Sequence, residues 1–434
     1  MSIPAWYLDE TRYKYSYEDV TGRREEPKTA LKKFGPYSKD KFRTTRIGVA
    51  MLSPTVHRQT GEKFYKAFQE GLSAYYKPFG SIYNLGSCYY HPIKVFSGTD
   101  AASYRTAALE LVREIESIEI DLWLCFLLIE DRFRQLSVRH NPYFAGRAVL
   151  LSNKVLVQGI TVEKASKRDW NLQWILDSIA VQSYAKLGGT PWAIATGRSE
   201  AEIIIGIGEA RVSGSPTDER FFGFATVFNQ NGAYLWTRFG QPVVGFDNYL
   251  ISLQDRVKQS IKDYTETEKV VPERLIIHLY KPPGKRTEAR AIETALAELG
   301  SDIECAIIHI DHRTDFRVFD SGAEDLKPKG RLVTYVDDYQ RLIVLSGSEV
   351  EWIPPRVARV RLSPRSTYRD LNGLTQQVYD FTNVHWAGLQ PNNVPVTIKY
   401  PSQLARMYAS LGQFDEDWYG LITAGFLSDK VWFI

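Results

Sequence analysis

The chain has 434 residues, of which 44% are hydrophobic and 24% are charged, so its composition is that of a globular protein large enough for two compact domains. A net charge of +3, from 54 basic and 51 acidic residues, excludes polyanion binding through overall charge alone. Three widely spaced cysteines exclude a disulfide framework, and the longest apolar run, 122–129, is too short to span a bilayer. We therefore expect a cytoplasmic protein.

Residues 1–43 mix charges, prolines and aromatic residues without sustained periodicity, so we expect an irregular lead-in segment. The following part alternates buried strands with amphipathic helices. Strands are predicted over 47–52 and 121–129. Apolar residues recur at helical spacing in two places, at Phe64, Phe68, Leu72 and Tyr75 and at Tyr104, Ala108, Leu111, Val112 and Ile115. This order predicts a parallel sheet flanked by helices.

A helix should begin at Asn141-Pro142, because asparagine is a good N-cap and proline suits the first helical position. Tyr143 and Arg147 then lie one turn apart on the same face. A strand over 154–160 follows. The next helix has Leu172, Ile175, Leu176 and Ile179 as its buried stripe, places Gln182 and Lys186 four residues apart, and ends at Gly188-Gly189.

Beyond Trp192 the pattern changes to longer strands and hairpins, later joined by helices. Strands are predicted over 203–207, 221–228, 233–236, 275–280 and 305–310, a hairpin over 331–345, and helices over 249–264, 287–299 and 403–411. This order predicts a mixed sheet with helical cover.

Five polar groups from the end of the first domain could converge on one small anion: Tyr143, Arg147, Gln158, Gln182 and Lys186. Cationic, amide and hydroxyl donors of this kind suit a terminal phosphate. The chain ends in the apolar run 431–434, which we expect to be buried. Its carboxylate then needs a partner, unless the tail docks with the carboxylate at the surface.

The stretch from Gln182 through Lys186-Leu-Gly-Gly-Thr-Pro-Trp192 resembles the junction of the MID and PIWI domains of Argonaute proteins. The resemblance extends to Glu26–Tyr37, to the basic loop His309–Phe319, and to Val394–Tyr400 followed by Leu404-Ala405. It covers essentially the whole chain and leaves no room for a PAZ domain, so the chain is most similar to short prokaryotic Argonautes. The resemblance implies an α/β fold, with a Rossmann-like MID domain over 44–190 and an RNase H-like PIWI domain over 191–434, after the lead-in segment.

In that family the MID domain binds the 5′-phosphate of a guide strand. The resemblance assigns Tyr143, Gln158, Gln182 and Lys186 to this pocket, with Arg147 where a lysine is usual. It also implies a magnesium ion that bridges the phosphate and is held by Gln182 and the C-terminal carboxylate, here that of Ile434.

Cleavage by an RNase H-like domain needs several carboxylates that hold two metal ions about 4 Å apart. The expected positions carry Gly208, a residue near Tyr280, and Ser402 instead. Glu209 is one residue from Gly208, but a shift of one residue moves a strand side chain to the opposite face. The sequence therefore predicts no slicing activity.

Two further patterns give only weak support to other functions, nucleotide binding and metal binding. Gly206-x-Gly208 lacks the third glycine of a dinucleotide-binding fingerprint. His309, Asp311 and His312 could suggest a metal site, but strand alternation separates His312 from the other two, which favours a basic loop beside nucleic acid.

The resemblance implies a protein that loads a 5′-phosphorylated guide, expected to be RNA, and pairs it with a single-stranded DNA target without cutting it. An APAZ-containing partner would carry a TIR, sirtuin-like or nuclease effector for defence against plasmids or phage. Backbone contacts are expected from Lys154, Lys164, Lys167, Arg168, Arg356, Arg359, Arg361 and Arg365. Two alternatives stay open: a guide-dependent nuclease that uses noncanonical carboxylates such as Glu209, and a homodimeric protein that binds nucleic-acid ends.

Overall fold

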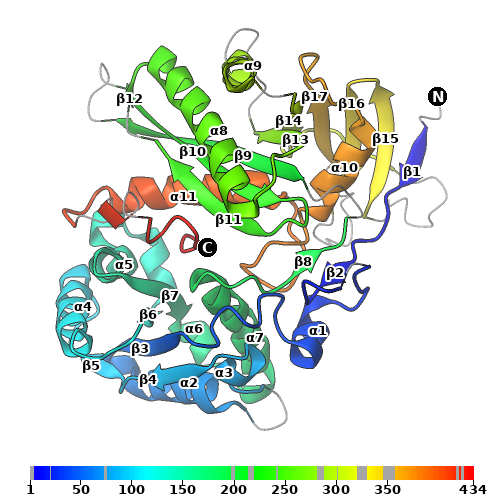
Figure 1. The fold of residues 1–434 in the computed structure, drawn as a ribbon. Coiled ribbons are helices and arrows are strands. Elements are labelled where there is room, and N and C mark those ends of the chain that lie inside the picture. Colours follow the sequence, from blue (N-terminus) through cyan, green and yellow to red (C-terminus); the bar gives the residue numbers. More distant parts are fainter. Residues whose placement is uncertain are drawn as a thin grey trace.

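The structure is a computed structural model with two large β-sheets, each covered by helices on both faces, and a small two-stranded sheet (Figure 1). It describes residues 4–19, 21–72, 76–196, 201–213, 219–240, 243–280, 288–300, 302–319, 330–345, 357–416, 420–421 and 425–434, with backbone alone for 209–213 and 219–222. None of the helices in these ranges is long and apolar enough to cross a bilayer.

The first sheet is entirely parallel, as predicted. Its strands are β3 (Arg46–Pro54), β4 (Ser87–Tyr90), β5 (Lys94–Phe96), β6 (Leu122–Ile129) and β7 (Val155–Thr161). They follow the order β4-β3-β6-β7, with β5 also on β3, so β7 ends the sheet. The helices are α2 (Arg58–Glu70), α3 (Phe79–Ile82), α4 (Ala101–Ile115), α5 (Pro142–Ser152), α6 (Val162–Ala165) and α7 (Asp169–Lys186).

Alternation along β3 divides the core of this sheet. Met51 packs in one cluster with Phe64 of α2 and Leu172 of α7, whereas Leu52 packs in another with Leu111 of α4. The predicted helices therefore bury most of the stripes that their sequences indicate, but α2 ends at Glu70, so Leu72 lies beyond the helix and is only partly buried. Tyr75, which was expected to continue the first stripe, lies outside the described residues.

The second sheet is mixed, as predicted. Its strands are β9 (Glu202–Ser213), β10 (Glu219–Asn229), β11 (Tyr234–Phe239), β12 (Val243–Val244), β13 (Arg274–Leu279), β14 (Glu304–Asp311), β15 (Leu332–Asp337), β16 (Gln340–Val344) and β17 (Val357–Leu362). β9, β13 and β14 are parallel neighbours, and the flanking strands are antiparallel. One face packs on α8 (Phe246–Glu268) and α9 (Glu288–Leu299), and the other on α10 (Leu371–Asp380) and α11 (Val396–Leu411).

The N-terminal segment differs from the expectation. β1 (Ala5–Tyr7) adds to β15 at the end of the large sheet, β2 (Tyr13–Lys14) pairs with β8 (Ala193–Ile194), and α1 (Pro27–Phe34) is helical. The prediction of an irregular segment was therefore wrong. Strands of two or three residues are too short to show alternation, and their partners are far away in the sequence.

Three later elements were also missed or shortened. β17 was treated only as a basic patch, because arginines alternate with its buried residues. α10 was not predicted. α11 begins at Val396, upstream of the predicted start, and contains Pro401, which sequence rules place at a helix start or break.

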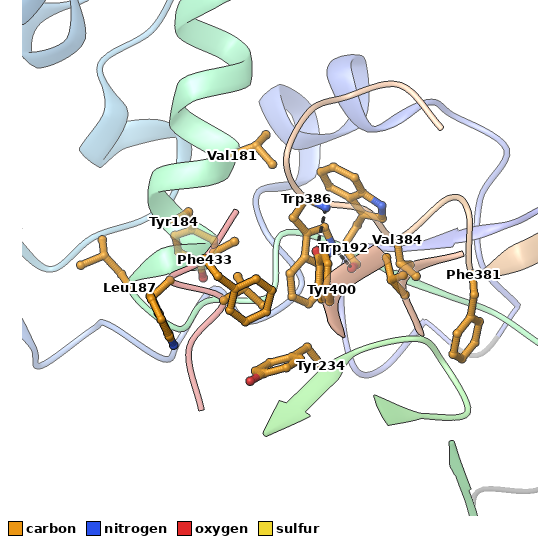
Figure 2. Packing of buried hydrophobic residues seen from close by; sticks show 14 of the residues in the cluster. Val181, Tyr184, Leu187, Trp192, Tyr234, Phe381, Val384, Trp386, Tyr400 and Phe433 are labelled. Carbon is orange, nitrogen blue, oxygen red and sulfur yellow. Dashed lines mark hydrogen bonds between the residues drawn. The ribbon is translucent and has the colours of Figure 1, made fainter. Parts of the chain in front are cut away.

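The stretch that follows Lys186 carries the chain from one sheet to the other through a shared core. Figure 2 shows Tyr184 and Leu187 close to Phe433 and the tryptophans of the second domain. Trp192 donates its indole N–H to the Asn383 carbonyl at 2.8 Å, and Trp386 donates to the Trp192 carbonyl at 3.2 Å. The two sheets therefore fold around one continuous cluster of buried residues.

Candidate nucleic-acid interface

The start of α5 positions the first pair of site residues. Asn141 caps the helix by accepting a hydrogen bond from the Tyr143 backbone N–H at 3.0 Å. Arg147, one turn later, donates to the Tyr143 hydroxyl and to the Trp432 carbonyl. Gly159 on β7 admits the tyrosine ring, because a Cβ there would lie 3.0 Å from Tyr143 Cε2. The predicted shared face of Tyr143 and Arg147 is confirmed.

The second group of site residues lies along the open edge of β7. Lys186 donates to the Val157 carbonyl at 2.9 Å and to Gln158 Oε1 at 2.7 Å. Gln158 Nε2 donates to Gln182 Oε1 at 3.0 Å and to the Gly159 carbonyl at 2.9 Å. These side chains cap carbonyl groups of a strand that has no neighbour on that side among the described strands.

The domains meet at this edge. Gln182 Nε2 donates to the Ala387 carbonyl at 2.8 Å, and Arg147 contacts the Trp432 carbonyl, so both domains hold the network. Sequence reasoning missed these carbonyl groups of the second domain. Backbone acceptors carry no side-chain identity, so no sequence pattern could have identified them.

The network buries two positive charges. Arg147 is 0% exposed and Lys186 is 1% exposed. Within the described ranges, neither has a carboxylate in ion-pair distance, and Arg147 Nε lacks a hydrogen-bond partner. Desolvation, reinforced by the charge of Arg147, holds the pKa of Lys186 well below its usual range. Two buried cations without a counterion are costly, and an anion would remove much of that cost.

The last residues of the chain pack beside Arg147. Val431, Trp432 and Phe433 are buried and Ile434 packs against the same core, as the apolar sequence predicts. Figure 1 shows the C-terminus lying between the two sheets. Trp432 is thus held against Arg147, while the role of the Ile434 carboxylate stays a prediction.

The three positions expected to have lost cleavage carboxylates have different surroundings. A Cβ at Gly208 would lie 2.5 Å from both Phe224 Cε2 and Pro401 Cβ, so the space is already filled. Tyr280 follows β13 and is 41% exposed, and Ser402 is exposed on α11. Glu209 has no described side chain. Across the described residues, no group of three or more His, Cys, Asp or Glu side chains is placed to hold a metal.

His309 lies near the end of β14, an inner strand of the large sheet, opposite Arg361 of β17. His309 Nε2 faces the Tyr280 carbonyl at 3.3 Å, and burial lowers the pKa of His309 and of His312. Asp311 pairs with Arg359 at 3.2 Å rather than with either histidine. This arrangement favours the interpretation as a basic element.

The predicted backbone contacts do not form one cluster. Lys154 precedes β7, whereas Lys164, Lys167 and Arg168 follow it, and a strand of this length spans roughly 23 Å. All four are exposed. Three of the remaining predicted contacts have described positions: Arg359 pairs with Asp311, Arg365 pairs with Glu293 at 2.7 Å, and Arg361 is half-buried on β17. Arg356 lies outside the described residues.

We expect inorganic phosphate to stabilise the wild-type protein through this network, by about 2.7 kcal/mol when its concentration is a hundred times the Kd. Lys186→Met should abolish this gain, because it keeps the side chain's length and removes one of the two buried charges. Thermal unfolding measures the effect. Lys66→Met, at an exposed lysine of α2, is the matched control and should respond to phosphate as wild type does. An equal phosphate response in Lys186→Met would contradict an anion site.

The same lysine predicts a pH dependence. Its folded-state pKa is lowered, so between that value and about 10.4 the unfolded chain binds more protons and stability rises with pH. Wild type without phosphate should gain more stability than Lys186→Met as pH rises through this window, measured by denaturant unfolding. If stability changed with pH in the same way for both proteins, burial would not lower the pKa of Lys186.

Gly208→Asp should destabilise the protein by about 3 kcal/mol or more, because Phe224 and Pro401 leave no space and the new carboxylate would be buried. Ser402→Asp, at an exposed position next to Pro401 on α11, should change stability by less than about 0.5 kcal/mol. Denaturant unfolding compares the two. A mild effect of Gly208→Asp would mean that α11 shifts readily away from β9.

Comparisons with known proteins show which proteins the chain resembles. A family model for the Piwi domain matches residues 144–354. The chain is 24% identical over 416 residues to Protein argonaute of Cereibacter sphaeroides, covering 88% of this chain and 53% of the relative. It is 24% identical over 301 residues to a Piwi protein of Archaeoglobus fulgidus, covering 63% of this chain and 68% of the relative. The chain thus spans about half the length of the first relative.

Solved structures show the same fold. Clostridium butyricum Argonaute bound to a guide DNA and a 19-mer target DNA superposes with a TM-score of 0.73 at 17% identity, covering 95% of this chain and 54% of that one. Drosophila Piwi superposes with a TM-score of 0.68 at 15% identity, covering 98% and 56%. The predicted α/β fold, with an RNase H-like second domain, is confirmed.

Proposed function

From the premise that the chain carries a Piwi domain in an Argonaute fold, we propose that it recognises a target strand through a bound nucleic-acid guide and does not cut the target. The observation that carries this proposal is the pair of buried cations, Arg147 and Lys186, at the open edge of β7. A terminal phosphate supplies up to two negative charges and several acceptor oxygens, which match these cations and the neighbouring hydroxyl and amide groups.

In the proposed complex, Tyr143, Arg147, Gln158, Gln182 and Lys186 bind the guide's 5′-phosphate. The guanidinium of Arg147 is planar and carries several N–H donors, whereas a lysine has a single ammonium group. Arg147 can therefore donate hydrogen bonds to two phosphate oxygens at once. The guide is RNA in this proposal and the target is single-stranded DNA. Base pairing reads the target sequence, while exposed basic side chains such as Lys164, Lys167 and Arg168 hold the backbone.

A magnesium ion would enter this pocket only together with the phosphate. Gln182 Oε1 and the Ile434 carboxylate are oxygen donors of the kind that Mg²⁺ prefers, but two buried cations repel a metal until an anion neutralises them. When bound, the ion would supply further positive charge to the phosphate. Gln182 would have to release Gln158 Nε2, its present hydrogen-bond partner, or share its oxygen with it.

If the protein recognises a target without cutting it, another component has to supply the activity that follows recognition. The packed surroundings of Gly208 support this part of the proposal, because a metal-binding side chain has no space there. We place the output in an APAZ-containing partner with a TIR, sirtuin-like or nuclease effector. Target binding would switch that effector on in defence against plasmids or phage.

We expect wild type to bind a 5′-phosphorylated single strand more tightly than the same strand with a 5′-hydroxyl. Lys186→Ala should remove about 1.5 to 3 kcal/mol of this preference, which is about ten- to a hundredfold in Kd, because one charge-assisted hydrogen bond is lost. Lys66→Ala, an exposed lysine with the same charge change, is the control. Fluorescence anisotropy with both oligonucleotides measures it. Equal affinities for the two ends in wild type would favour a protein that binds ends without a guide.

Purified protein loaded with a guide should leave a matched target intact in Mg²⁺ or Mn²⁺, because the positions of the cleavage carboxylates carry Gly208, Tyr280 and Ser402. Denaturing gels of labelled target, with a mismatched target alongside, check this. Guide-dependent cutting that Glu209→Gln abolishes would instead establish a nuclease with a noncanonical site.

A further inference from the structure

The first half of α7 exposes two tryptophans. Trp170 is 58% exposed and Trp174 is 44% exposed, and their spacing of four residues places them on one face of the helix. The other tryptophans with described side chains are buried or partly buried. Two partly exposed indole rings on one helix face offer flat apolar surfaces on which unpaired bases can stack.

Basic side chains surround this pair. The Lys28 ammonium of α1 lies over the Trp174 ring, and Lys167 and Arg168 are exposed directly before the helix. In the part of the chain that the structure describes, these three cations form no ion pair with a carboxylate. The nearest acidic residue in sequence, Asp169, is paired with Lys63 at 2.9 Å.

This surface is separate from the phosphate pocket. At about 100° per residue, Trp174 and Trp170 point about 120° and 160° away from Lys186 around the axis of α7. They also lie about 18 and 24 Å from Lys186 along that axis. The tryptophans therefore lie on a different side of α7 from the phosphate pocket.

We propose that the outer face of α7 is a second binding surface for single-stranded nucleic acid, with unpaired bases stacked on Trp170 and Trp174. Phosphates of that strand lie against Lys28, Lys167 and Arg168. Aromatic side chains stack on any base, so the surface holds a strand without reading its sequence. The inference shares with the proposed function only the assumption of a nucleic-acid ligand and does not depend on the pocket.

The test uses the full chain and an oligodeoxythymidine of about ten nucleotides with a 5′-hydroxyl, which the phosphate pocket does not favour. Wild type should bind it with quenching of tryptophan fluorescence. The double variant Trp170→Ala/Trp174→Ala should bind at least about tenfold more weakly, since each stacked base contributes about 1 to 3 kcal/mol. Trp170→Phe/Trp174→Phe should recover most of the affinity, because phenylalanine also stacks. Both variants change exposed side chains, so their thermal unfolding should match wild type.

Tyr339→Ala is the matched control. This tyrosine is 37% exposed but lies beside Asp337 and Asp338, where a phosphate backbone is repelled, so its removal should leave binding unchanged. Unchanged affinity in the double alanine variant, or equal affinity for a duplex whose bases are already stacked, would overturn the proposal. Lys186→Met separates the two sites: it should lose the preference for a 5′-phosphate and keep the quenching by the 5′-hydroxyl strand.

Discussion

The burial of the Lys186 ammonium against the open edge of β7 is the constraint around which the rest of the molecule is arranged. The lysine caps the Val157 carbonyl and holds Gln158, and Gln158 in turn fixes Gln182. Desolvating the charge of this lysine is costly, so its neighbours have to be held in place. The second domain contributes to this, because Gln182 donates to the Ala387 carbonyl and Arg147 donates to the Trp432 carbonyl.

The chain directly after Lys186 makes that docking possible. Gly188 adopts φ +100°, which favours glycine, and a Cβ at Gly189 would lie 2.3 Å from Tyr184 Cε1. The chain can therefore turn tightly off α7 and place Trp192 in the core of the second domain (Figure 2). The tail returns to the same place and offers the Trp432 carbonyl to Arg147. An anion bound there would touch groups held by both domains, so its binding can be coupled to how the domains sit together.

The surroundings of Gly208 show a second kind of constraint. A Cβ at Gly206 would lie 2.0 Å from the Thr397 carbonyl oxygen, and one at Gly208 would lie 2.5 Å from Pro401 Cβ, so α11 packs directly on the backbone of β9. The glycines are required by this close approach. The packing of α11 therefore leaves no space for a larger side chain at either position of β9.

Elements with long local patterns could be predicted from the sequence. Helical spacing located α4 and α7, buried runs located β3, β6 and β7, and the N-cap at Asn141 located α5 and placed Tyr143 and Arg147 on one face. That these residues meet, and that Lys186 and Arg147 are buried without a carboxylate within the described chain, depends on how distant segments pack. The pairing of β1 with a strand more than three hundred residues away depends on the same packing. Periodicity reflects only neighbours along the chain. Burial and strand pairing depend on which distant segments pack together, and the pKa of a lysine depends on whether those segments exclude water from it.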